Sequence, residues 1–245
     1  YLLKYQLITA IASRKTGGRH IKYIEDRIEH LMASGTHACD RRYEAAFGFT
    51  SDGVCTAMHF RCLNDCGASA ENNAPSMCWK PIVMLAGPYR VDHVRYDLTA
   101  VVTNKSPEGA YRGYGCPPHT LVIERLMDKA AKALNLEPTE LRRRNLIGPD
   151  EFPYTTPAGT DYDSGDYPGL MDLATSKAGY DELRKLQAQK RAEGKLVGIA
   201  AVLGIEPGGV WAVTGPYRDW TGGRAVINPE SVGIRLDEAG RLDVE

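Results

Sequence analysis

The stretch AYRGYGCPPH, residues 110–119, brings together residue types that suit an anionic or oxygen-rich ligand. Gly113 and Gly115 carry no side chain, so a ligand can approach the backbone closely there. Arg112 adds a permanent cation whose planar guanidinium donates several hydrogen bonds. Tyr111 and Tyr114 offer flat apolar faces with polar tips, which fit a small planar substrate.

The stretch lies between a predicted strand over residues 93–104 and a helical pattern that runs from Pro117 to about Leu134. Proline is favourable in a first helical turn, and a helix N-terminus offers unpaired N–H groups with a partial positive charge. An anion site is one interpretation. The alternative is a tight strand-to-helix turn with a surface arginine. A nucleotide site is a third, weaker interpretation, because the stretch matches neither the G-x-G-x-x-G motif nor a P-loop.

The composition is that of a globular protein. Of the 245 residues, 43% are hydrophobic and 25% are charged, and the net charge of −1 gives no basic surplus for nucleic acid. The apolar runs are too short for a membrane span. None of the six cysteines forms a C-x-x-C pair, so we expect reduced thiols in a cytoplasmic protein and no zinc site.

Helical and strand patterns mix along the chain, with strands in hairpins rather than in regular βαβ units, which predicts an α+β fold of mixed sheets with packed helices. Asp52-Gly53 is a turn signal between strands over 36–49 and 54–65. The remaining predicted elements are short strands near residue 21 and after 195, a hairpin at 232–245, and helices over 3–16, from 26, from 138, over 168–177 and over 180–192. Both ends look cut, which predicts a fragment or a split polypeptide.

The motifs together resemble the large, molybdenum-cofactor-binding subunit of the xanthine dehydrogenase, aldehyde oxidase and carbon monoxide dehydrogenase family. The similar segments are GGRHIKYIEDRIEHLMAS, YEAAFGFTSDGVCTAMHFR, GAYRGYGCPP, ERLMDKAAKALNLEPTELRRRNLI and FPYTTPAGTDYDSGDYPGLMDLA, in the order that the family has them. The resemblance implies the family's molybdopterin-binding fold. It places residues 1–160 in the first molybdenum-cofactor-binding domain and 161–245 at the start of the second.

The resemblance also implies roles for single residues. Arg112 and Gly113 would contact the molybdenum-pterin cofactor, and Tyr114 would form one wall of the substrate pocket. Counting back from Tyr89 without gaps puts Lys80 where xanthine-type enzymes have a substrate-orienting arginine, so purine recognition is not expected. Carbon monoxide enzymes carry a copper-binding cysteine directly after the loop arginine, where this chain has Gly113.

Several parts of the family's machinery have no counterpart in this sequence: the GGFGGK-like cofactor loop, the GQGH-like pterin segment and the glutamate base. We therefore assign no catalytic residue and no metal ligand to this chain. The resemblance implies a hydroxylase of an aldehyde or N-heteroaromatic carbon, with molybdopterin or its cytosine dinucleotide form as cofactor. Its partners would be other pieces of the molybdenum subunit, an iron–sulfur subunit and an FAD subunit. The alternative is a non-catalytic fragment or scaffold that binds no cofactor.

Other candidate residues have simpler explanations. We expect a packing or surface role for His119 and a solvated or intersubunit face for Arg142, Arg143 and Arg144. The carboxylates of Asp161, Asp163 and Asp166 lack the spacing of a calcium loop and are expected to cap turns. The stretch with Glu206, Gly208 and Gly209 is more typical of a loop, although the resemblance places it near the entrance of the site.

Overall fold

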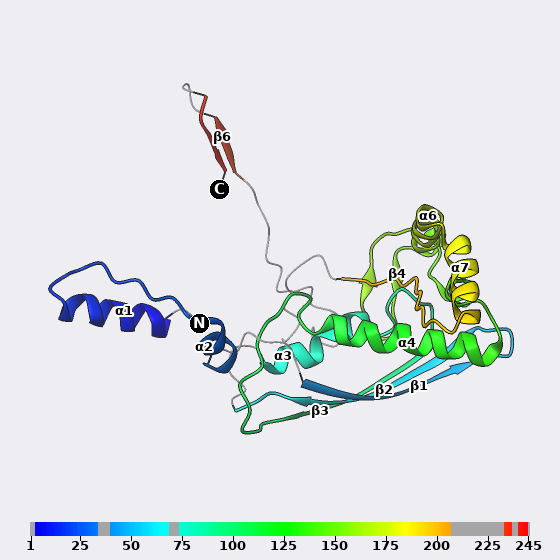
Figure 1. Cartoon of the computed structure of the whole chain (residues 1–245), viewed down its shortest axis with the longest axis horizontal. Coiled ribbons are helices and arrows are strands. Elements are labelled where there is room, and N and C mark those ends of the chain that lie inside the picture. The colour runs from blue at the N-terminus through cyan, green and yellow to red at the C-terminus, as the bar shows by residue number, and fades with distance from the viewer. Residues whose placement is uncertain (1–2, 34–39, 69–73, 207–232, 237–239, 245) are drawn as a thin grey trace.

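A computed structural model describes all residues except 1–2, 34–39, 69–73, 207–232, 237–239 and 245 (Figure 1). Its elements in chain order are α1 (Leu3–Lys15), α2 (Arg27–Ala33), β1 (Asp40–Phe49), β2 (Cys55–Asp65), α3 (Ala74–Trp79), the 3-10 turn η1 (Lys80–Met84), β3 (His93–Val101), α4 (Cys116–Leu134), α5 (Pro138–Asn145), the 3-10 turn η2 (Pro149–Glu151), β4 (Tyr154–Thr155), β5 (Asp161–Tyr162), α6 (Tyr167–Ala178), α7 (Tyr180–Ala192), β6 (Ile234–Leu236) and β7 (Leu242–Val244).

The centre of the fold is a mixed three-stranded sheet in the order β1-β2-β3. β1 and β2 form the predicted antiparallel hairpin, in which Tyr43 faces Cys62, and β3 joins β2 in parallel, with Cys62 facing Leu98. A parallel pair needs a crossover, and here the crossover contains α3 and η1. This connection carries Lys80 towards the loop that follows β3.

Helix α4 covers one face of the sheet (Figure 1). Met58 and Phe60 of β2 and Ile123 and Met127 of α4 are at most 1% exposed and belong to one apolar cluster. Met171 of α6 belongs to the same cluster, so the helices after residue 160 pack on the first part of the chain. Burial of this apolar surface fixes the position of the α4 N-terminus relative to the strand ends.

Two sequence predictions of strands are wrong. Residues 19–26 and 195–206 are described as irregular backbone without ladder partners. Both segments have alternating or continuous apolar residues, but a strand also requires a neighbouring strand for its hydrogen bonds. The chain passes over residues 195–206 in extended form and buries Leu203 in the cluster described above.

The arginine run on α5 also differs from the prediction. Arg142 is fully buried: its Nε donates to Glu124 Oε2 at 2.7 Å and its Nη2 lies 2.9 Å from Asp128 Oδ1. Only Arg143 and Arg144 form exposed pairs, with Asp172 and Glu140. The buried pair joins α5 to α4.

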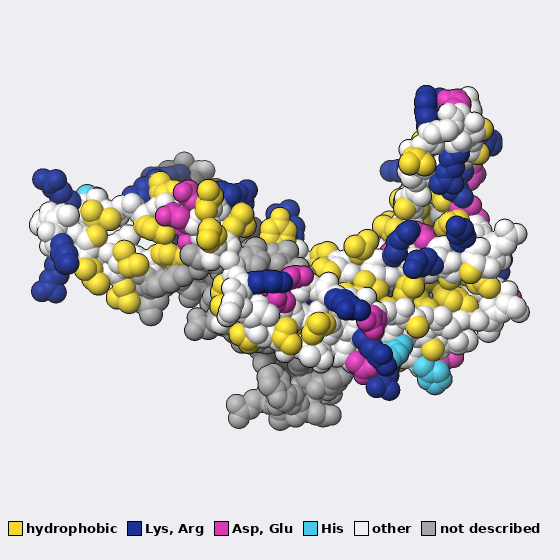
Figure 2. Space-filling model, turned by 60° about the horizontal axis from the view of Figure 1, so that its bottom comes forward, with side chains coloured by type: hydrophobic (Ala, Val, Ile, Leu, Met, Phe, Trp, Pro, Cys, Tyr) yellow, Lys and Arg dark blue, Asp and Glu magenta, His cyan; other side chains and the backbone are white. Residues whose placement is uncertain are grey.

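Helix α1 forms as predicted, but its apolar residues Leu7, Ile8 and Ile11 are each more than half exposed. Figure 2 shows hydrophobic side chains on the surface of this N-terminal arm, at the left. On the same view, acidic, basic and histidine side chains are interspersed, with no extended area of a single sign. No helix among the described residues is long and apolar enough to cross a membrane.

Candidate functional site

The loop of residues 110–115 makes a tight left-handed turn between β3 and α4. Gly113, Tyr114 and Gly115 have φ of +86°, +46° and +88°. The amide of Tyr114 donates to the carbonyl of Tyr111 at 2.7 Å, and the amide of Cys116 donates to the carbonyl of Gly113 at 3.0 Å. Tyr114 is one of two non-glycine residues with positive φ in the described chain. Such a conformation is costly and persists only where the surroundings impose it.

The packing around Gly115 is tight enough to impose the positive φ angles of the loop. A Cβ on Gly115 would lie 2.0 Å from the carbonyl oxygen of Met77, closer than any real contact. Its backbone therefore lies directly against the end of α3, the helix that precedes η1. Only glycine fits this position, because both the space and the φ angle exclude a side chain.

A buried polar network holds the loop to the sheet. Arg41 of β1 donates from Nη1 to the carbonyl of Gly115 at 3.0 Å, and its Nη2 lies 3.3 Å from Glu108 Oε1. Asn64 of β2 donates from Nδ2 to Glu108 Oε2 at 2.6 Å and accepts from Arg41 Nε. The side chains of Arg41 and Glu108 are 2% and 1% exposed. Because a buried charge is costly without its partner, this network fixes the loop.

This network was not predicted from the sequence. A signal was present: with a period of two, Arg41 falls on the same face of β1 as Tyr43, Ala45 and Phe47, the face that turns towards the core. A charged residue on that face needs a buried partner.

The structure brings together three of the four predicted site residues. The Lys80 ammonium lies 5.3 Å from the centroid of the Tyr114 ring. Lys80 Nζ also lies 3.5 Å from Glu206 Oε1, and a Cβ on Gly113 would be 3.9 Å from Glu206 Oε2. These residues come from η1, from the loop and from the end of the extended segment, so three distant parts of the sequence meet here.

Arg112, the fourth predicted residue, lies beside this group and is exposed. Within the described part of the chain its guanidinium forms no hydrogen bond or ion pair with another residue. The described residues thus take up none of its donors, and the loop places Arg112 next to Gly113.

The N-terminus of α4 differs from the prediction. The first turn of α4 was expected to offer unpaired N–H groups, but Pro117 and Pro118 have none and the Cys116 amide is bonded to Gly113. The prolines that fix the start of the helix also remove its donors. An anion at this loop would be bound by the Arg112 side chain, with the helix contributing its partial charge.

Burial keeps the thiol and imidazole groups beside the loop in their neutral forms. Burial raises the pKa of the Cys116 thiol to about 11, and the five described cysteines are buried and form no disulfide with one another. His119 is fully buried, contacts the Leu85 carbonyl through Nε2 at 3.0 Å, and burial lowers its pKa to about 4. The packing role expected for His119 is confirmed. Among the described residues, no group of three or more His, Cys, Asp or Glu side chains could hold a metal ion.

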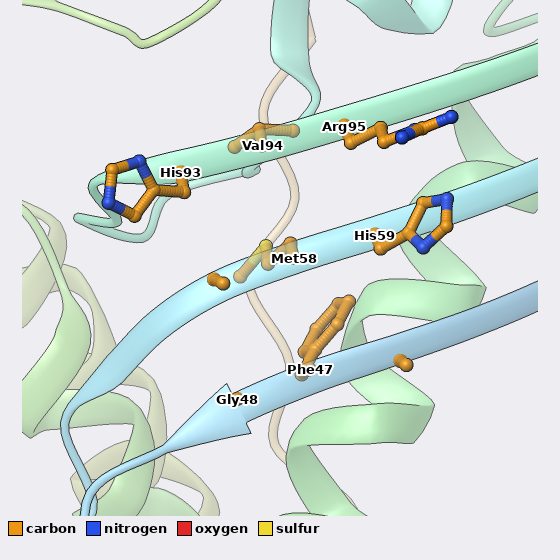
Figure 3. Close-up of a pocket in the computed structure, with 9 residues that line it drawn as sticks. Phe47, Gly48, Met58, His59, His93, Val94 and Arg95 are labelled. Atoms are coloured by element: carbon orange, nitrogen blue, oxygen red, sulfur yellow. The ribbon is translucent and has the colours of Figure 1, made fainter.

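A separate groove of about 370 Å³ lies on the sheet (Figure 3). Its lining comes from the end of β1 and the starts of β2 and β3: Ala46, Phe47, Gly48, Ala57, Met58, His59, His93, Val94 and Arg95. Arg41, which holds the loop, is five residues from Ala46 along β1, or about 17 Å at about 3.3 Å per residue. None of the predicted site residues lines this groove, so it is distinct from the loop.

Comparisons with known proteins place the chain in a family. Residues 2–146 match the family described as molybdopterin cofactor-binding domain. The nicotine 6-hydroxylase large subunit of Paenarthrobacter nicotinovorans is 32% identical over 91% of this chain and 27% of that protein. The carbon monoxide dehydrogenase large chain of Afipia carboxidovorans is 32% identical over 81% of this chain and 25% of that protein.

Among solved structures, quinoline 2-oxidoreductase from Pseudomonas putida 86 is similar with a TM-score of 0.80 and 31% identity, over 98% of this chain and 30% of that one. The fold and the loop thus define a molybdopterin-binding domain of the aldehyde oxidoreductase type. The chain belongs to the xanthine dehydrogenase, aldehyde oxidase and carbon monoxide dehydrogenase family, as a part of its large subunit. It spans between a quarter and a third of the length of these relatives.

The described residues fit the family's cofactor. A pterin cofactor carries phosphate and oxo groups, which require cations and room at the backbone. Arg112 supplies an exposed guanidinium without a partner in the described chain, and Gly113 leaves the adjacent backbone without a side chain. The network of Arg41, Asn64 and Glu108 holds Gly115, at the end of the loop that carries both residues.

Proposed function

We propose that this chain presents the loop of residues 110–115 to the molybdenum-pterin cofactor and the substrate of a molybdenum hydroxylase. The enzyme would oxidise an aldehyde or an N-heteroaromatic carbon with water as the source of oxygen. Electrons would leave to an iron–sulfur subunit and an FAD subunit. The observation that supports this most directly is the exposed guanidinium of Arg112, which has no partner among the described residues, beside Gly113 and Tyr114 in the segment that matches the family.

Each loop residue has a distinct task in this proposal. Arg112 binds the anionic groups of the cofactor with its planar fork of donors. Gly113 keeps the backbone open, so that the cofactor can approach. Tyr114 offers the face of its ring to a planar substrate, and Lys80, whose ammonium lies 5.3 Å from the ring centroid, orients that substrate.

The cofactor, when bound, supplies the two-electron chemistry and activates water. Residues of this chain bind the cofactor and orient the substrate. Further segments of the subunit would supply the glutamate base. We also propose that residues 1–160 belong to the first and residues 161–245 to the second molybdenum-cofactor-binding domain, with α6 and Leu203 forming the packed junction between them.

The test uses the complete complex with all subunits. Arg112→Met should lower the molybdenum content measured by mass spectrometry, while Arg112→Lys should retain part of it. Arg42→Met is the matched control, because Arg42 is exposed and forms an exposed ion pair with Glu44 on the sheet. Unchanged molybdenum content in Arg112→Met would refute the role of this residue.

Tyr114→Ala tests the substrate side. The variant should keep its molybdenum and change the ratio of kcat/KM between an aldehyde and an N-heteroaromatic compound. Loss of the metal in this variant would contradict the assignment of Tyr114 to the substrate. Absence of molybdenum from the wild-type complex would favour the alternative, a scaffold that binds no cofactor.

A further inference from the structure

Glu206 is the residue of this site to which the proposed function gives no task. Its Oε1 lies 3.5 Å from Lys80 Nζ, and its side chain is 56% exposed, whereas that of Lys80 is 17% exposed. Its other oxygen points towards Gly113, where an added Cβ would lie 3.9 Å away. The carboxylate therefore lies between the Lys80 ammonium and the loop that carries Arg112.

Among the described residues, an aromatic ring and a carboxylate lie near the Lys80 ammonium. The face of the Tyr114 ring attracts it through the ring quadrupole, at 5.3 Å from the centroid. Glu206 compensates its charge. Without Glu206, the ammonium of Lys80 would lie over the aromatic ring without a compensating charge and would attract a ligand that carries a carboxylate. With Glu206, the charge of Lys80 at the ring face is compensated by a carboxylate at 3.5 Å.

We propose that Glu206 is a specificity-determining residue: by pairing with Lys80 it makes the site accept uncharged planar substrates and reject those that carry a carboxylate. This inference rests on the proposed function. A carboxylate on the substrate would have to displace Glu206 from Lys80 or lie beside a like charge, and both cost binding free energy.

A purely structural ion pair would behave differently. If Glu206 only fastened the extended segment of residues 195–206 to η1, its removal would weaken binding of charged and neutral ligands alike. If it sets specificity, its removal would change their ratio, and the change would depend on the presence of Lys80.

The experiment measures binding by calorimetry on the complete, cofactor-loaded complex, with ligand pairs that share a shape and differ in charge. Pyridine-3-carboxamide with pyridine-3-carboxylate and benzaldehyde with 4-carboxybenzaldehyde are suitable pairs. Glu206→Gln should tighten binding of the carboxylate member by about tenfold, a modest gain because the pair is partly screened by solvent, and leave the neutral member within about threefold. The double variant Lys80→Met/Glu206→Gln should lose this gain.

Glu182→Gln is the matched control, because Glu182 forms an exposed pair with Lys185 on α7. A carboxylate-to-neutral affinity ratio that Glu206→Gln leaves unchanged, with molybdenum content intact, would overturn this inference and leave the proposed function standing. An equal loss for both members of each pair would also overturn it, in favour of a structural role. Failure of every neutral ligand to bind the wild-type complex would instead refute the proposed function.

Discussion

Replacement of Arg41 by methionine should release the loop from the sheet. Methionine keeps the length of the side chain but removes every donor. Glu108, at 1% exposed, would then remain as a buried carboxylate held by the Asn64 amide. The carbonyl of Gly115 would lose the donor that it has at 3.0 Å.

The size of the effect follows from burial. Removal of one partner of a buried ion pair costs about 3–5 kcal/mol, and the remaining Asn64 contact favours the lower end, about 3 kcal/mol. For a protein of this size, 1 kcal/mol corresponds to about 2–4 °C, so the midpoint of thermal unfolding should fall by roughly 6–12 °C. The double variant Arg41→Met/Glu108→Gln should lose about 2 kcal/mol less than the sum of the single variants, because the stranded charge is gone.

Two measurements check this. Calorimetric unfolding gives the loss of global stability. Hydrogen exchange of the Tyr114 and Cys116 amides gives the loss of local stability, since both amides close turns of the loop. Arg42→Met, on the same strand with an exposed side chain, should cost less than about 0.5 kcal/mol. A cost below about 1 kcal/mol for Arg41→Met, or strictly additive variants, would refute the argument that this network holds the loop.

Three further variants test other parts of the fold. Gly115→Ala should be far more destabilising in thermal unfolding than Gly194→Ala, because both glycines have positive φ but only the first meets a backbone atom, at 2.0 Å; equal costs would show that the loop can move. Unfolding by denaturant should show stability lost as the pH falls from about 6.5 to about 4, by on the order of 3 kcal/mol, because the unfolded chain protonates His119 while burial lowers its pKa to about 4 in the fold. His119→Leu should flatten that pH dependence, and an unchanged slope would contradict a buried neutral imidazole. Arg142→Met should cost about 3–5 kcal/mol by denaturant titration, since Glu124 would stay buried without its cation; a cost below about 1 kcal/mol would mean that Glu124 is neutral.

Local signals in the sequence predicted much of the fold. The β1–β2 hairpin has a strong turn signal, and α4 has two prolines and a continuous helical pattern, so both were predicted close to their observed bounds. Residues 195–206 have an apolar pattern as good as that of a strand, but their lack of a ladder depends on neighbours that a single segment cannot reveal.

The site was predictable only in part. The residue types of the loop predicted it as a candidate site, and the resemblance to the family predicted Lys80. The buried Arg142 lies in a run of three arginines whose local pattern indicates exposure to solvent. Its partner Glu124 is 18 residues away in the sequence. The network of Arg41 and Glu108 spans 67 residues, and such pairs become visible only once the sheet and helix are packed.

The ion pair between Lys80 and Glu206 joins residues that are 126 positions apart. During synthesis, β1 to β3 and α4 are translated before Glu206. Until Glu206 has been made, no carboxylate from that position compensates the ammonium of Lys80. The electrical balance of this region therefore depends on a segment that is translated after both Lys80 and Tyr114.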